Sequence, residues 1–153
     1  ARLTFSQHHM ALATGDGAAA EITCVAVDPC GPCPVDVPLR VEVGFVAHRR
    51  ISAAAWRLRF VADVVHFRHG VELSQTSASS FDEGSHVIEV VAPAGVPVAG
   101  VPLGALESLG ALEITLSSAS SNAAAELASV QLVTDVRPCD SGGYVRGVLD
   151  AFS

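Results

Sequence analysis

The sequence predicts an all-β fold, namely a single-domain antiparallel β-sandwich of about eight strands that is Ig-like, C2-like or jelly-roll-like. Apolar and polar residues alternate with period two in several short runs, which is typical of strands. Segments rich in proline, glycine and serine separate these runs at close spacing. Half of the residues are hydrophobic, with one Trp and one Tyr, and 153 residues fit one domain spanning residues 1–153.

Apolar and polar residues alternate most strictly in two segments, residues 37–47 and residues 54–65. In the first, every second residue is apolar: Leu39, Val41, Val43 and Phe45. In the second, one face holds Trp56, Leu58, Phe60, Ala62 and Val64. Because half-buried antiparallel strands show this pattern, we expect the two apolar faces to be buried together.

The other predicted elements show a less strict pattern. Further strands are predicted at residues 3–6, 20–27, 71–75, 86–91, 112–117 and 127–137, and residues 144–152 are predicted as a last strand or a short helix. Loops are predicted at residues 28–36 and 76–85, with a turn at His69-Gly70. At most one short helix is expected, near residues 102–109, where leucines recur every three residues after Pro102. No amphipathic helix separates the strands, which excludes alternating β-α units.

Charge excludes some partners. The formal net charge is −7, with 16 acidic and 9 basic residues, and every basic residue is arginine. This balance argues against nucleic acid and against an anionic membrane surface, because both need a basic stripe. No apolar run is long enough for a membrane-spanning helix, and no signal peptide is visible, so we expect a cytoplasmic location.

The four cysteines form one recognisable motif. Cys30-Gly31-Pro32-Cys33 resembles the tetrapeptide at the active site of thioredoxins, but Pro34 and a predicted strand follow it where that family has a helix. We therefore interpret it as a turn between strands. A zinc site would need ligands drawn from Cys24, Cys30, Cys33 and Cys139, of which only one pair has metal-ligand spacing. Cys24 is predicted on the core face of its strand. A Cys30–Cys33 disulfide, or a link from either to Cys139, is left open.

No arrangement of residues predicts catalysis. A nucleophile elbow and a phosphate-binding loop are both missing, so we expect neither an enzyme nor a cofactor. His66, Arg68 and His69 lie close to Asp63, a cluster that would suit an anion or a metal. Solvated loop residues are the alternative interpretation.

Arginines gather near the two strongest strands. Arg40, Arg57 and Arg59 occupy their polar faces, and Arg49 and Arg50 lie in the connection. If the two strands pair, these arginines form one basic face that would dock a carboxylate-rich or phosphorylated partner. The alternative is that acidic residues such as Glu42 and Asp63 neutralise the arginines.

These observations favour a non-catalytic protein-interaction or scaffolding module. The partner is a protein of unspecified identity, and a homodimer through a sheet edge is a further expectation. The alternative is a carrier of a lipid or small hydrophobic ligand between the sheets. A weaker alternative is a zinc or thiol-redox protein that uses Cys30 and Cys33.

Overall fold

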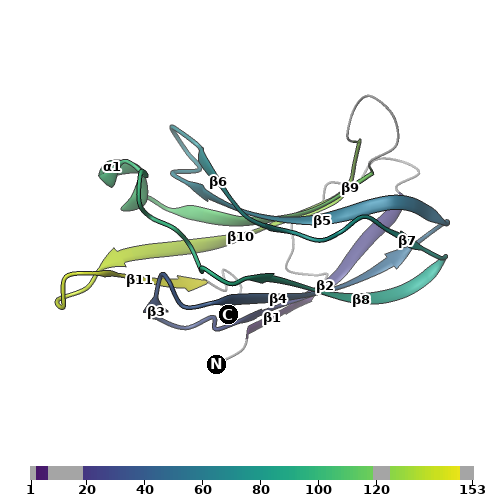
Figure 1. Cartoon of the computed structure of the whole chain (residues 1–153), viewed down its shortest axis with the longest axis horizontal. Coiled ribbons are helices and arrows are strands. Elements are labelled where there is room, and N and C mark those ends of the chain that lie inside the picture. Colours follow the sequence, from purple (N-terminus) through teal and green to yellow (C-terminus); the bar gives the residue numbers. More distant parts are fainter. Residues whose placement is uncertain (1–2, 7–18, 119–124, 149–153) are drawn as a thin grey trace.

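The computed structural model describes residues 3–6, 19–118 and 125–148, which form two antiparallel sheets stacked face to face (Figure 1). The predicted all-β sandwich is confirmed. The elements are β1 (Leu3–Ser6), β2 (Ala20–Asp28), β3 (Cys33–Pro34), β4 (Leu39–Ala47), β5 (Ile51–Ala62), β6 (His69–Gln75), β7 (Ser79–Phe81), β8 (Gly84–Ala92), α1 (Leu103–Leu106), β9 (Gly110–Ser118), β10 (Ala125–Pro138) and β11 (Tyr144–Val148).

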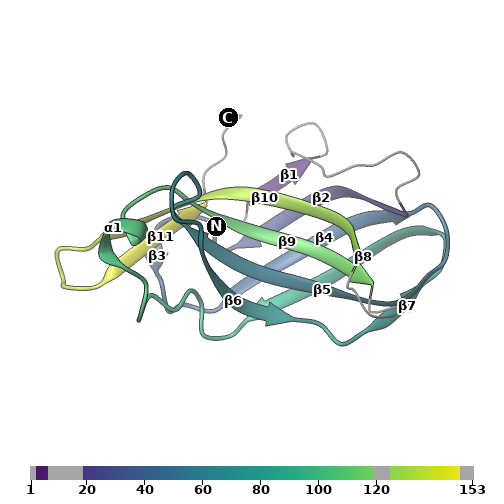
Figure 2. The ribbon, with the colours of Figure 1, turned by 90° about the horizontal axis from the view of Figure 1, so that it is seen from above.

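One sheet has four strands in the order β1-β2-β4-β8, and the other has seven. The path of the larger sheet is β3-β11-β10-β9-β5-β6, with β7 pairing to β5 beside β6. Viewed from above, β5, β9 and β10 cross over the strands of the smaller sheet (Figure 2). The short helix α1 lies at one end of the sandwich, beside the hairpin between β5 and β6. Among the described residues, no helix has the length and apolar character needed to span a membrane.

The core is built from the two alternating faces that the sequence predicts. All four predicted inward residues of β4 are buried, as are Trp56, Leu58, Phe60 and Ala62 on β5. The Phe45 and Trp56 rings meet edge to face between the layers, with centroids 5.1 Å apart. The two strongest strands therefore bury their apolar faces against each other, as expected.

These two strands do not pair, however, and the prediction that their arginines share one sheet face is wrong. β4 lies between β2 and β8 in the smaller sheet, whereas β5 lies between β9 and β6 in the larger one. Each of these two strands has one apolar face. When the strands lie in facing layers, each apolar face buries the other. If they paired side by side in one sheet, a further layer would be needed to bury both faces. Arg40 consequently points away from the core on the opposite side from Arg57 and Arg59.

Several element boundaries also differ from expectation. The described residues contain eleven strands, because β3 and β7, with two and three residues, are too short to show alternation. His69 and Gly70 begin β6 and do not form a turn, since Ala62 and Val61 pair with them. The last element is a strand over Tyr144–Val148; the rest of the predicted segment lies outside the described residues. The helix is confirmed inside its predicted range.

The prediction that Cys24 faces the core is also wrong. The pairing of β2 with β4 shifts between Ile22 and Cys24, which marks a β-bulge. A bulge adds a residue and reverses the alternation, so Val25 is buried and Cys24 is on the outer face. There its Sγ lies over Gly44, where a Cβ atom would meet it at 2.6 Å.

Candidate functional site

Four charged side chains from three strands meet on the outer surface of the larger sheet. Because Trp56, Leu58 and Phe60 face the core, the residues between them on β5 must face outward. The register in which β5 pairs with β6 and β9 then decides which side chains lie beside these outward residues. We call the resulting group the arginine–glutamate face; it consists of Arg57 and Arg59 on β5, Glu72 on β6 and Glu113 on β9.

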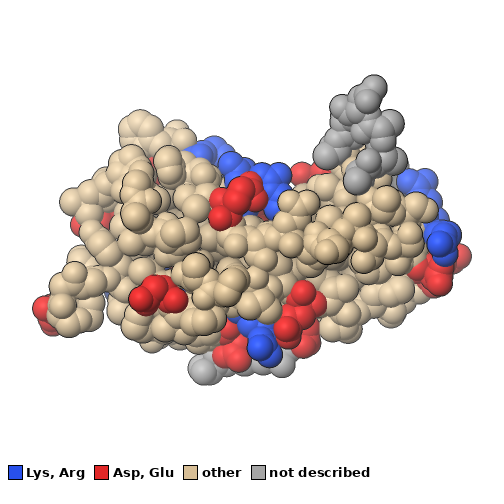
Figure 3. Space-filling view, viewed as in Figure 1, with Lys and Arg blue, Asp and Glu red and all other residues tan. Residues whose placement is uncertain are grey.

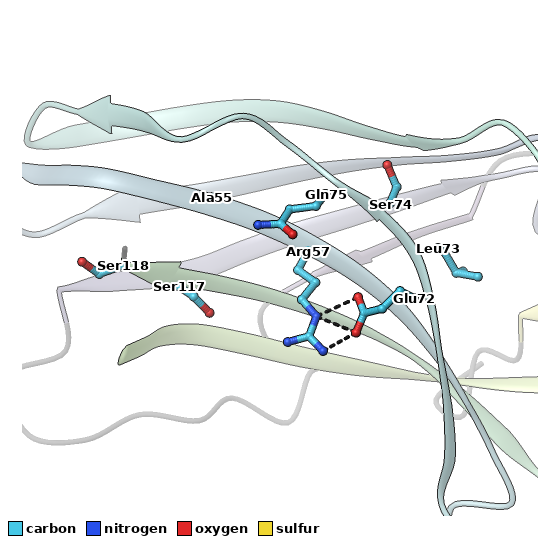
Figure 4. A pocket seen from close by; sticks show the side chains of 8 residues that line it. All are labelled: Ala55, Arg57, Glu72, Leu73, Ser74, Gln75, Ser117 and Ser118. Atoms are coloured by element: carbon cyan, nitrogen blue, oxygen red, sulfur yellow. Dashed lines mark hydrogen bonds and ion pairs between the residues drawn. The ribbon is translucent and has the colours of Figure 1, made fainter. Parts of the chain in front are cut away.

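Arg57 and Glu72 form its strongest pair. Arg57 Nε donates to both Glu72 oxygens, at 2.9 and 2.8 Å, and Arg57 Nη2 donates to Oε1 as well. Figure 4 shows the two side chains reaching toward each other from β5 and β6. Hydrogen bonding to Arg57 lowers the pKa of Glu72, and the same bonds raise the pKa of Arg57. Both groups are therefore held in their charged forms.

Arg59 is less fully paired. Its Nε lies 3.6 Å from Glu72 Oε1, and its Nη1 lies 3.4 Å from Glu113 Oε1. Within the described part of the chain, the second contact is the only hydrogen bond of this guanidinium. The Arg59 side chain remains 38% exposed. Its guanidinium lies against Gly70, where an added Cβ would be 2.0 Å from Arg59 Nη2. The absence of a side chain at Gly70 therefore leaves room for Arg59.

Glu113 is fixed from the other side. Gln131 on β10 donates from Nε2 to Glu113 Oε2 at 2.7 Å. Arg68, in the loop before β6, lies 3.9 Å from the same oxygen. These charged groups and the Gln131 amide thus form a continuous row across β6, β5, β9 and β10, in which each carboxylate has more than one partner.

Polar hollows border this row. A hollow of about 470 Å³ is lined by Ala55, Arg57, Glu72, Leu73, Ser74, Gln75, Ser117 and Ser118 (Figure 4). A second, of about 220 Å³, is lined by Arg57, Arg59, Glu113, Thr115, Ser117 and Glu126. Hydroxyl, amide, guanidinium and carboxylate groups all point outward here. Chemically, the surface can donate and accept several hydrogen bonds at once, which suits recognition of a polar partner.

The other predicted arginines lie elsewhere. Arg40 is on the outer surface of the smaller sheet, with Nη1 3.6 Å from Glu89 Oε2. Arg50 pairs with Asp82 at the end of the sandwich, where Arg49 and Arg50 line a hollow of about 180 Å³. Figure 3 accordingly shows basic and acidic atoms side by side at several separate places. Among the pairs described here, neutralisation by acidic residues is the interpretation that the structure favours.

Sequence reasoning missed both glutamates of the arginine–glutamate face. Glu113 occupies the outward position between the apolar residues Leu112 and Ile114, so alternation alone would have placed it on a polar face. Its approach to Arg59 depends on β9 pairing with β5, more than fifty residues earlier in the chain. A bulge in the pairing of β5 with β6 places Glu72 opposite Arg59, on the outer surface and within reach of Arg57, and no residue pattern revealed this bulge.

The cysteines and histidines do not assemble into a metal site in the described residues, where no group of three or more potential ligands is found. Cys24 lies on the smaller sheet, Cys30 and Cys33 lie beside β11, and Cys139 follows β10; all four are free thiols. This arrangement separates Cys24 and Cys139 from Cys30 and Cys33, so the four zinc candidates do not meet.

Asp63 and His66 organise the hairpin between β5 and β6. The buried Asp63 carboxylate accepts the backbone N–H groups of His66 at 3.1 Å and Phe67 at 3.4 Å, and His66 Nδ1 lies 3.3 Å away. Burial favours the neutral acid, but these hydrogen bonds outweigh it and lower the pKa of Asp63. Asp63 therefore shapes a loop, and it does not neutralise the arginines as the sequence suggested.

The inward-facing residues form one continuous hydrophobic cluster that joins both sheets. Trp56, Phe45 and Phe60 are its largest fully buried side chains. The hollows described above lie on outer surfaces or at the end of the sandwich. The carrier hypothesis therefore gains no supporting observation and stays a prediction.

Comparison with known proteins establishes the fold and no more. The crystal structure of the C-terminal domain of wzt is similar, with a TM-score of 0.60 and 11% identity over 97% of this chain and 88% of that one. A β-glucosidase from Paenibacillus barengoltzii aligns with a TM-score of 0.35 and 14% identity, over 92% of this chain and 18% of that one. No protein-family model matches the sequence. No curated protein matches it either.

Proposed function

We propose that this chain is a non-catalytic interaction module that docks a protein partner on the arginine–glutamate face. The observation that carries this proposal is the partial pairing of Arg59, which lies between two carboxylates but makes one long hydrogen bond among the described residues. A guanidinium has five N–H donors; Nε of Arg59 is buried, so the donors offered to a carboxylate of the partner are those of Nη1 and Nη2. The partner surface is accordingly expected to be acidic, with amide or hydroxyl groups beside the carboxylate.

The position of these groups supports binding. They are carried by paired strands, and strands hold side chains more rigidly than loops. Arg57 is already fixed by Glu72, and Glu113 is fixed by Gln131, so little side-chain entropy remains to be lost when a partner binds. The cytoplasmic setting that the sequence predicts is part of the same proposal.

The test compares three forms of the full chain: the wild type, the double variant Arg57→Gln/Arg59→Gln, and Arg40→Gln as control. Arg40 also lies on an outer sheet surface near a glutamate, but on the opposite side of the sandwich. Each form is immobilised and exposed to native lysate, and the retained proteins are identified. Binding of a recovered partner is then measured by calorimetry at low and at raised salt.

We expect one protein to be retained by the wild type and by Arg40→Gln and lost with Arg57→Gln/Arg59→Gln. Its affinity should fall as salt rises, because charged contacts at an exposed surface are screened. The same set of proteins on all three forms would overturn the proposal. So would a stable monomer that retains nothing.

A further inference from the structure

Cys30 and Cys33 lie on either side of a short irregularity at the edge of the larger sheet. Cys33 in β3 pairs with Arg146 of β11. The carbonyl oxygen of Cys30 accepts the backbone N–H of Val148 at 2.9 Å, which sets Cys30 opposite Val148. The chain advances by three residues from Cys30 to Cys33, whereas β11 advances by two residues between their partners, Arg146 and Val148. Gly31 and Pro32 therefore form a bulge.

This bulge places both cysteines on the same side of the sheet. Residues directly opposite each other in an antiparallel pair project to the same face, and Arg146 and Val148 are both on the inner face of β11. Two strand steps separate positions 146 and 148, which corresponds to about 6.8 Å. That spacing is at the upper end of the range in which two Cα atoms can be bridged by a disulfide. Gly31 has no atom within 4 Å of where its Cβ would be, so no neighbouring side chain packs against the bulge at that position.

Beside Cys33 is a buried cation. Arg146 is 4% exposed, and its Nη1 donates to the carbonyl oxygens of Val35 at 2.7 Å and Pro34 at 3.1 Å. Its Nε and Nη2 are buried without a hydrogen-bond partner among the described residues. Burial lowers the pKa of this guanidinium, while the charges of Cys33 and Asp36 act in the opposite sense. Arg146 is therefore a buried cation, opposite Cys33 in the strand pairing, with two of its nitrogens unpaired among the described residues.

We propose that Cys30 and Cys33 are a reversible disulfide site, beside which Arg146 supplies a buried positive charge. With a disulfide such as oxidised glutathione as oxidant, the Cys33 thiolate attacks one sulfur and releases one glutathione thiolate. The Cys30 thiolate then attacks the Cys33 sulfur of this mixed disulfide and releases the second. The two cysteines lose two protons and two electrons, and one oxidised glutathione becomes two reduced molecules.

The remaining cysteines are separated from this pair. Cys139 follows β10, on the other side of β11 from β3, and its Sγ lies 3.2 Å from Ser141 Oγ. Cys24 lies on the outer surface of the other sheet beside Gly44. Of the disulfides that the sequence left open, the structure therefore favours Cys30–Cys33. This inference does not depend on the proposed docking face.

The experiment equilibrates full-length variants with mixtures of oxidised and reduced glutathione, traps free thiols by alkylation, and measures intact mass. Cys24→Ser/Cys139→Ser retains only the proposed pair, and Cys30→Ser/Cys33→Ser retains only the matched control pair. We expect the first variant to lose two hydrogens and to form a closed disulfide at glutathione ratios that leave the second variant reduced. A first variant that stays reduced, or that carries glutathione on both cysteines without closing, would overturn the proposal.

Arg146 is tested as a positioning residue in the Cys24→Ser/Cys139→Ser background. We expect Arg146→Met to slow formation of the mixed disulfide several-fold and Arg146→Lys to restore most of the rate, because lysine keeps the positive charge. Thermal unfolding of each variant establishes that it is folded. Equal rates for the three forms, or a loss that lysine does not restore, would remove Arg146 from the proposal.

Discussion

Replacing Gly110 with alanine is expected to destabilise the sandwich where β9 begins. Gly110 is buried, and a Cβ atom there would lie 2.8 Å from Phe60 Cε2 and 2.8 Å from the backbone oxygen of Val61. Ordinary van der Waals contact begins at 3.4 Å. One of these two neighbours is the ring of a core residue, and the other is backbone in a paired strand. Neither can rotate away as the end of a flexible surface side chain can.

Overpacking of this kind costs about 1–3 kcal/mol. Alanine also restricts the unfolded chain, which offsets about 0.4–1 kcal/mol of that cost. We therefore expect the free energy of unfolding to fall by about 1–2 kcal/mol. For a protein of this size, that loss lowers the midpoint of thermal unfolding by about 2–8 °C. Urea unfolding followed by Trp fluorescence measures it, because Trp56 is the one tryptophan and is buried.

Gly104→Ala is the matched control. Gly104 lies in α1, is exposed, and has no atom within 4 Å of where its Cβ would be. The same chemical change should there stabilise the protein by about 0.4–1 kcal/mol, because only the restriction of the unfolded chain remains. If Gly110→Ala were as stable as the wild type, or if the two variants shifted stability in the same direction, the packing argument for Gly110 would be refuted.

Three further changes test other parts of the structure. Leu58→Ala removes a fully buried side chain and should cost about 2–5 kcal/mol in urea unfolding; a smaller loss would contradict the close packing between the sheets. Asp63→Asn should remove a pH dependence of the free energy of unfolding. The pKa of Asp63 in the folded protein is below its ordinary 3.8, so its ionised carboxylate stabilises the fold above that pH. This stabilisation is lost as the pH falls through the folded pKa. Unfolding curves of wild type and variant should therefore converge on acidification, and a constant difference would contradict this. Gly70→Ala should displace the Arg59 guanidinium while changing stability by less than about 0.5 kcal/mol; an unchanged Arg59 Nε–H resonance in NMR spectra would show that the contact is wrong.

The strands could be predicted from the sequence where one face is buried and the other is exposed to solvent. In β4 and β5 a period of two recurs over many residues, and the positions of Val43 and Leu58 in the core followed from it directly. Short or irregular segments gave no such signal. β3 has two residues, β7 has three, and the bulge at Cys24 exchanges inner and outer faces within one strand.

The candidate site could be predicted only in part. Alternation placed Arg57 and Arg59 on a polar face, and this is where they lie. Their carboxylate partners are 15 and 54 residues away along the chain. Contacts of that kind depend on strand order and register, which local sequence does not specify.

The sequence by itself determined the fold class and the inward and outward residues of the long strands, because burial of an apolar face imposes a period that can be read locally. Only the tertiary structure decided that β4 and β5 face each other across the core, which divided the arginines between opposite surfaces. The tertiary structure also brought Arg146 opposite Cys33, and Glu113 and Glu72 to Arg59. These contacts join distant segments, and they form because the layers must close around one core.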